Sequence, residues 1–267
     1  MKRQFVLITG ASSGIGAAFA RIAAQEGHDV GLSARREDRL ASLAQNIQAE
    51  FQVKAEIFPQ DLSVHGGADA LMNQVKASGR DVDVLINNAG YSIPQHFTGV
   101  SLDQQTAFLE LTVTAPVVLA HHCLVGMLEQ GRGRIINISS ITALSSGGKG
   151  HTLYPAGKAF LVKFSQSLSA EYGERGIVTT AVMPGFVKTE FQAANGMDDK
   201  MQGGATSRFQ QSAEDVAREV WRRNQQGVEL VAPGIAAKIG AACLRYLPER
   251  LVRMVTRRAA EKYYIGD

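Results

Sequence analysis

Residues 5–16 of this 267-residue chain read FVLITGASSGIG, and this stretch decides the fold. The five residues before Gly10 are apolar or β-branched and carry no charge, which is typical of a strand buried on both faces. Glycines then stand at Gly10, Gly14 and Gly16, and from residue 17 apolar residues recur at helical spacing. A strand, a glycine-rich turn and a helix in this order predict the first unit of a parallel α/β sheet.

The same alternation continues along the chain. Short apolar runs predict strands at 5–9, 29–34, 54–58, 82–86, 133–138, 178–183 and 228–231, and helical patterns lie between them, as at 17–25, 40–50, 68–76 and 159–172. The sequence contains no Pro/Ser-rich linker and no internal repeat. We therefore expect one α/β domain, a parallel sheet covered by helices on both faces.

Two regions depart from this rhythm. Residues 190–212 are glycine-rich and polar and follow a strand end, which favours a substrate lid over a plain surface loop. Residues 236–264 contain apolar residues at helical spacing with arginines between them, interrupted by Pro248. We divide the chain into a nucleotide-binding domain at 1–235 and a basic helical extension at 236–267. The extension either packs on the same domain, which we favour, or binds an anionic membrane surface.

Bulk properties exclude several classes of protein. The net charge of +3 is too small to indicate nucleic-acid binding, and no His/Cys cluster has metal-ligand spacing. Cys123 and Cys243 are far apart, as in proteins from reducing compartments. We find neither a secretory signal nor a run of about 18 apolar residues. These observations predict a cytoplasmic location.

The glycine-rich turn predicts a dinucleotide site, because backbone N–H groups at a helix N-terminus bind pyrophosphate. Gly10 permits the tight turn, Gly14 lets the phosphates approach, and Gly16 lets the helix pack closely. The ribose is read at the end of the second strand, where the sequence has Arg35 and no acidic residue. Arg35, with the hydroxyl of Ser13, favours the 2′-phosphate of NADP(H), whereas we interpret Arg36 as a solvated charge at a helix start.

Further strand ends add polar groups to the same edge of the sheet. Asp61-Leu62 follows the third strand and either accepts from adenine or caps the turn. Asn88-Ala89-Gly90 follows the fourth strand, and Pro184-Gly185 follows the sixth. The backbone of Val187 and the hydroxyl of Thr189 are suited to hold a nicotinamide carboxamide.

Tyr154 and Lys158 are four residues apart, so on a helix they lie on one face. A neighbouring ammonium favours the phenolate, which predicts a lowered pKa for Tyr154 and a usable general acid/base. Pro155 requires Tyr154 to lie near the helix start. Ser139-Ser140, at the end of the fifth strand, supplies hydroxyls for the reacting oxygen.

In these motifs the chain resembles the short-chain dehydrogenase/reductase family, in its compact single-domain branch. The resemblance implies a Rossmann doubly wound sheet of about seven strands and catalysis by Ser140, Tyr154 and Lys158. It also implies a homodimer or homotetramer through helices at 101–130 and 152–173, and Arg35 matches the arginine of NADP-preferring members. Where many members carry an Asn, this chain has Thr112, and Gly157 replaces a small polar residue. We expect cofactor contacts from Gly10, Ser12, Ser13, Gly14, Ile15, Gly16, Arg35, Asp61, Leu62, Asn88, Ala89, Gly90, Tyr154, Lys158, Pro184, Gly185, Val187 and Thr189.

The sequence thus predicts an NADP(H)-dependent oxidoreductase acting on an alcohol/carbonyl pair. An epimerase or dehydratase on the same frame is less favoured, because such enzymes usually carry an added substrate domain. A non-catalytic NADP-binding sensor or scaffold is the main alternative, motivated by Thr112. We expect a largely apolar substrate pocket lined by Ile93, His96, Ser146, Leu153, Phe186, Phe191 and Phe209.

Overall fold

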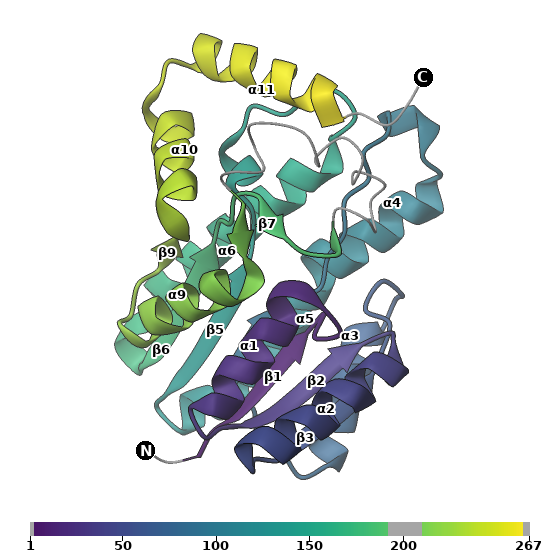
Figure 1. Ribbon diagram of the computed structural model, residues 1–267, viewed down its shortest axis with the longest axis vertical. Coiled ribbons are helices and arrows are strands. Elements are labelled where there is room, and N and C mark those ends of the chain that lie inside the picture. The colour runs from purple at the N-terminus through teal and green to yellow at the C-terminus, as the bar shows by residue number, and fades with distance from the viewer. Residues whose placement is uncertain (1–2, 192–209, 264–267) are drawn as a thin grey trace.

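The computed structural model describes residues 3–191 and 210–263 (Figure 1). Seven parallel strands form one sheet in the order β3-β2-β1-β4-β5-β6-β9. They are β1 (Phe5–Thr9), β2 (Asp29–Ala34), β3 (Ala55–Pro59), β4 (Val84–Asn87), β5 (Gly133–Ile138), β6 (Ile177–Val182) and β9 (Leu230–Val231). The predicted doubly wound Rossmann sheet and its single domain are confirmed, and strand ends differ from the expected ones by one or two residues at most.

Helices cover both faces of the sheet, which explains why the strands are mostly buried and rich in apolar residues. On one face α1 (Gly14–Gln25), α2 (Glu37–Phe51) and α9 (Ala213–Gln225) enclose a core that includes Phe19, Leu40 and Trp221. On the other face α3 (Gly67–Ala77), α5 (Ala115–Glu129) and α6 (Leu153–Tyr172) enclose a second core.

The strand order reverses at the centre of the sheet, because β1 pairs with both β2 and β4. In such sheets ligands bind outside the carboxyl ends of the strands at this reversal. A small sheet of β7 (Val187–Lys188) and β8 (Gln211–Ser212), which the sequence did not predict, lies beyond β6. The predicted lid at 190–212 falls largely outside the described residues.

One helical run, Leu102–Glu129, is long and apolar enough to cross a membrane by length and composition, with a mean hydropathy of 1.7. This differs from the expectation that no segment qualifies. The run comprises α4 (Leu102–Leu109), the π-helical turn η2 (Glu110–Thr114) and α5. Its α5 part packs on α3, β4 and β5 and buries Leu119, Cys123 and Met127. Packing in the core therefore accounts for part of its apolar character, since 44% of the apolar window is buried.

The C-terminal region forms the expected amphipathic helices, α10 (Gly234–Tyr246) and α11 (Glu249–Tyr263), on either side of Pro248 (Figure 1). Helix α10 lies against the short helix η3 (Ile141–Leu144), and a Cβ added at Gly240 would stand 2.7 Å from Ile141. Ala237 and Val252 are buried, whereas Ile235, Ile239 and Tyr246 are exposed. The tail thus contacts the rest of the chain, and a domain boundary at residue 235 stays a prediction.

Candidate active site

A cavity of about 780 Å³ opens at the carboxyl ends of the strands. Loops after β1, β2, β4, β5 and β6 contribute to its wall, and its volume lies in the range of small-molecule sites. Of the catalytic and cofactor-binding residues predicted from sequence, the structure brings all but Gly16 to this wall: Gly10, Ser12, Ser13, Gly14, Ile15, Arg35, Asp61, Leu62, Asn88, Ala89, Gly90, Ser140, Tyr154, Lys158, Pro184, Gly185, Val187 and Thr189.

The glycine-rich turn has a geometry that fits a pyrophosphate. Gly10 and Gly14 have positive φ angles of 65° and 55°, which disfavour other residues. A Cβ at Gly16 would stand 2.3 Å from the carbonyl oxygen of Gly10, so this glycine serves close packing of α1. The N-cap Ser13 makes no side-chain cap hydrogen bond, and the first turn of α1 has no acidic residue. The helix N-terminus therefore presents its positive dipole end to the cavity.

A polar network joins this turn to the end of β4. The hydroxyl of Thr9 accepts from the backbone N–H groups of Asn88 at 3.0 Å and Ala89 at 3.1 Å. The Asn88 amide in return donates to the carbonyl oxygens of Thr9 and Gly10. Asn88 thus holds the two loops together, and Gly90 after it lies close enough that an added Cβ would be 3.4 Å from Lys158 Nζ.

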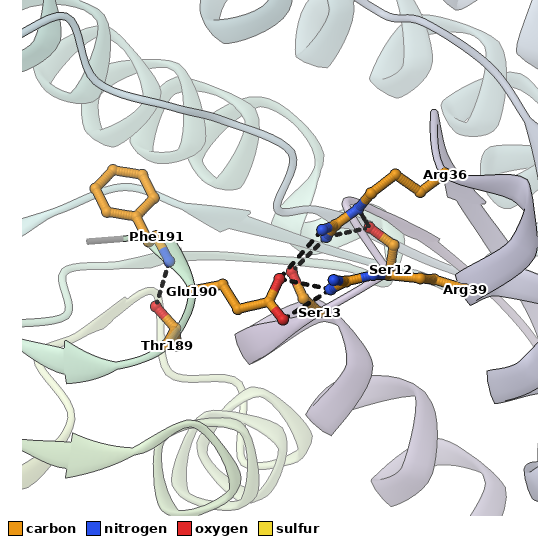
Figure 2. Close-up of polar contacts among 7 residues, drawn as sticks. All are labelled: Ser12, Ser13, Arg36, Arg39, Thr189, Glu190 and Phe191. Atoms are coloured by element: carbon orange, nitrogen blue, oxygen red, sulfur yellow. Dashed lines mark hydrogen bonds and ion pairs between the residues drawn. The ribbon is translucent and has the colours of Figure 1, made fainter. Parts of the chain in front are cut away.

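Two neighbouring arginines at the end of β2 have different environments. The Arg35 side chain is 70% exposed, and its nearest acid is Asp61 at 3.9 Å. Arg36 instead donates to the hydroxyls of Ser12 and Ser13, both at 2.9 Å, and pairs with Glu190 (Figure 2). The interpretation of Arg36 as a merely solvated charge was therefore wrong, because packing of α2 against the glycine-rich turn brings its guanidinium onto both serines.

The Asp61 carboxylate accepts hydrogen bonds within its own turn, from Ser63. It accepts from the backbone N–H of Ser63 at 2.9 Å and from the Ser63 hydroxyl at 2.6 Å. Burial would raise the pKa of Asp61, but the two Ser63 hydrogen bonds and the charge of Arg35 leave it lowered. Leu62 beside it is buried and offers an apolar wall.

The three predicted catalytic side chains meet at the opposite end of the cavity, where β5 faces the start of α6. Helix α6 begins at Leu153, so Pro155 stands in the first turn, where its missing N–H does no harm. The Ser139 hydroxyl donates to the Lys158 carbonyl oxygen at 2.6 Å, whereas the Ser140 hydroxyl accepts from the backbone N–H of Thr142 at 3.2 Å and lines the cavity beside Tyr154. Lys158 Nζ donates to the Ile138 carbonyl oxygen at 2.8 Å and lies 5.7 Å from the centre of the Tyr154 ring.

Burial controls the ionisation of this group. It raises the pKa of Tyr154 to about 12, although the hydrogen bond from Ser140 acts in the opposite direction. It also lowers the pKa of Lys158 to about 8. The lowered pKa predicted for Tyr154 is therefore wrong for this structure, because desolvation disfavours the phenolate more than its surroundings favour it. At neutral pH the pair consists of a protonated phenol and an ammonium.

Thr112 lies in η2 and is 1% exposed. Within residues 3–191 and 210–263 its hydroxyl has no hydrogen-bond partner. A Cβ added at Gly157 would stand 2.8 Å from the methyl group of Thr112. Gly157 therefore allows α6 to approach η2 more closely than any larger residue would.

The segment after β6 spans the cavity. Thr189 packs over Gly14, since a Cβ at that glycine would meet its methyl group at 3.1 Å. The Thr189 hydroxyl accepts from the backbone N–H of Phe191 at 3.3 Å. Consequently Glu190 points toward the arginines while Phe191 points the other way (Figure 2), with its ring 6.1 Å from that of Tyr154.

The substrate end of the cavity was predicted only in part. Phe186 and Phe191 line it, whereas Ile93, His96, Ser146 and Leu153 do not, and Phe209 lies outside the described residues. The wall also includes His151, whose pKa is lowered by burial, and it includes Cys243, Leu244 and Thr256 of α10 and α11, a contribution of these two helices that sequence reasoning missed. The His151 imidazole is thus a neutral polar group in a mostly apolar wall. No local pattern marks these contacts, which arise from packing of the tail.

Comparison with known proteins agrees with this geometry. The family model described as short chain dehydrogenase matches residues 4–200. Nodulation protein G of Rhizobium sp. (strain N33) is 37% identical over 183 residues, which cover 68% of this chain and 73% of the relative. A short-chain dehydrogenase from Sphingobium yanoikuyae in complex with NADPH superposes with a TM-score of 0.79 at 30% identity, covering 89% of this chain and 91% of that one. L-Sorbose reductase from Gluconobacter frateurii, complexed with NADPH and L-sorbose, gives a TM-score of 0.76 at 27% identity, covering 88% and 97%.

The fold and the cavity define a dinucleotide-binding α/β protein. The chain belongs to the short-chain dehydrogenase/reductase family. It is an NAD(P)-dependent oxidoreductase that acts on CH–OH and C=O groups of small molecules.

Proposed function

We propose that the protein is an NADP(H)-dependent alcohol dehydrogenase or carbonyl reductase in which Ser140, Tyr154 and Lys158 form the catalytic centre. One observation carries the proposal. The side chains of Ser140, Tyr154 and Lys158 line the same cavity as the glycine-rich turn. A substrate oxygen placed at the two hydroxyls would therefore lie beside the nicotinamide end of a dinucleotide whose pyrophosphate is at α1.

The roles follow from the geometry. The cofactor supplies or accepts the hydride when bound. Tyr154 donates its proton to the oxygen of a carbonyl substrate during reduction and takes it back during oxidation. Ser140 donates a hydrogen bond to the same oxygen and stabilises the charge that develops there. Lys158, held by the Ile138 carbonyl oxygen, keeps a positive charge near the phenol and offsets part of the cost of forming a phenolate.

The preference for NADP(H) is supported by the end of β2, which presents Arg35 and Arg36 and no acidic residue of its own. The two similar solved structures named above were determined with NADPH. An apolar ketone, aldehyde or lipid-like alcohol is the proposed substrate class, supported by Phe186, Phe191 and Leu244 in the wall.

We also propose a homo-oligomer in the cytoplasm. The family resemblance assigns subunit contacts to helices at 101–130 and 152–173, and the first of these exposes Leu102, Leu109 and Val125 in the single chain. Size-exclusion chromatography with light scattering tests the assembly: a monomer at micromolar concentration would contradict it. Packing of the tail on the domain remains preferred over a membrane contact, which co-sedimentation with anionic vesicles tests.

The proposed chemistry is tested by following NADPH and NADH absorbance against a panel of ketones and aldehydes, with Tyr154→Phe alongside. The wild type should oxidise NADPH faster than NADH, and the variant should bind NADPH normally yet lose at least about a hundredfold in kcat. Undiminished turnover in Tyr154→Phe would remove the phenol from the reaction. Tight NADPH binding without turnover of any carbonyl would favour the alternative, a cofactor-binding sensor or scaffold.

A further inference from the structure

Four side chains form a compact site at the adenosine end of the cavity, where α2 meets the glycine-rich turn. Arg36 donates from Nη2 to the hydroxyls of Ser12 and Ser13 at 2.9 Å, and from Nε to Ser12 at 3.2 Å. Arg39 lies one helical turn further along α2 (Figure 2). Each serine hydroxyl accepts from Arg36 and keeps its own O–H for donation. Two guanidinium groups and two hydroxyls therefore converge, which is the donor set that suits an oxyanion.

A carboxylate from a distant part of the chain occupies this site. Glu190 accepts from Arg36 Nη1 at 3.1 Å and from Arg39 Nη1 at 2.6 and 2.7 Å (Figure 2). Hydrogen bonds from Arg39 and then Arg36 keep the pKa of Glu190 lowered, so the carboxylate is charged at neutral pH. Glu190 stands 154 positions after Arg36 in the chain, and the short turn from Thr189 to Phe191 directs its side chain there.

The position of the site indicates what else it receives. Arg36, Ser12, Ser13 and Glu190 all line the cavity, beside Arg35 and Asp61 at the end of β2. In a Rossmann sheet this is where the ribose of the adenosine half is read, and an acid there accepts from a ribose 2′-hydroxyl while repelling a 2′-phosphate. Strand β2 supplies no such acid, but the tertiary structure brings Glu190, which follows β7, to this place.

We propose that Glu190 is an internal competitor for the anion site that receives the 2′-phosphate of NADP(H), and that it limits discrimination between NADP(H) and NAD(H). The inference rests on the proposed dinucleotide cofactor. A 2′-phosphate that binds at Arg36, Ser12 and Ser13 is repelled by the Glu190 carboxylate and competes with it for the Arg36 guanidinium, so it binds best when the carboxylate leaves Arg36. NAD(H) leaves Glu190 in place and donates its 2′-hydroxyl to it.

The test measures binding without chemistry. Adenosine 2′,5′-bisphosphate and adenosine 5′-monophosphate are titrated by calorimetry into wild type, Glu190→Gln and Glu50→Gln, and NADPH and NADH are titrated by fluorescence. Glu50→Gln is the matched control. Glu50 lies on α2, as Arg39 does, and its exposed carboxylate pairs with Arg21 of α1 at 2.9 Å. Exposed ion pairs are individually weak, so the effect is moderate. Glu190→Gln should tighten the bisphosphate and NADPH about three- to tenfold and change the monophosphate and NADH less than about twofold.

Arg36→Met identifies the site itself and should weaken the bisphosphate at least about tenfold while sparing the monophosphate. Unchanged or weaker bisphosphate binding in Glu190→Gln would overturn the competition, even if turnover with NADPH remains normal. Equal gains in Glu190→Gln and Glu50→Gln would overturn it as well, because general charge would then be the cause. Failure of the wild type to bind any of the four ligands would overturn both this inference and the proposed cofactor.

Discussion

Replacing Gly157 by Ala sets two known effects against each other at the contact between α6 and η2. Helix propensity alone favours Ala over Gly by about 1 kcal/mol in a helix interior. The added methyl group would, however, stand 2.8 Å from Cγ2 of Thr112 and 3.5 Å from a ring carbon of Phe108. Thr112 is 1% exposed and β-branched, so it has little freedom to rotate away.

The overlap should therefore decide the sign. Overpacking a buried contact costs about 1–3 kcal/mol, and after subtraction of the propensity gain of about 1 kcal/mol we expect Gly157→Ala to lower the free energy of unfolding by up to about 2 kcal/mol. For a chain of this size that corresponds to a fall in Tm of up to roughly 8 °C. Thermal and urea unfolding of the purified protein measure it directly.

Two comparisons isolate the cause. Gly126→Ala in α5 has the same propensity gain, and nothing lies within 4 Å of its added Cβ, so it should raise the free energy of unfolding by up to about 1 kcal/mol. Thr112→Ser removes the methyl group that the Cβ added at position 157 would strike, and in that background Gly157→Ala should become neutral or stabilising, a coupling of about 1–2 kcal/mol. If Gly157→Ala stabilises as much as Gly126→Ala does, the close contact is refuted.

Three further predictions concern the same region. Lys158 has a folded pKa of about 8 against 10.5 in its reference state, so between pH 8 and 10.5 the unfolded chain binds more protons and the free energy of unfolding rises with pH. The urea midpoints of wild type and Lys158→Met should therefore converge in this pH window. Parallel pH profiles of the two proteins would exclude a lowered pKa for Lys158. Ser139→Ala removes the buried hydrogen bond to the Lys158 carbonyl oxygen and should lower the free energy of unfolding by about 1–2 kcal/mol. Ser140→Ala should instead lower kcat about 100-fold with little change in Tm. The opposite result for the two variants would exchange the roles of the two serines. Thr112→Val replaces a buried hydroxyl without a described partner and should leave the free energy of unfolding unchanged or raise it by up to about 1 kcal/mol. A clear fall in Tm would show that the hydroxyl has a hydrogen-bond partner, for instance a water molecule.

Much of the fold was predictable because its signals are local. Apolar runs with interspersed helical patterns predicted all seven strands, since a strand buried on both faces must be apolar along its whole length. The glycines at 10, 14 and 16 were equally predictable, because a positive φ or a close backbone contact leaves room for nothing else. Four-residue spacing placed Tyr154 and Lys158 on one face of α6.

The sequence by itself therefore determined the sheet, the glycine-rich turn and the set of side chains gathered at the strand ends. Only the tertiary structure decided which arginine faces the serines, that Glu190 reaches them, and that burial raises the pKa of Tyr154 instead of lowering it. The reason is physical. Backbone periodicity acts between near neighbours in the chain, whereas desolvation and ion pairing depend on how distant segments pack, which no short stretch of sequence encodes.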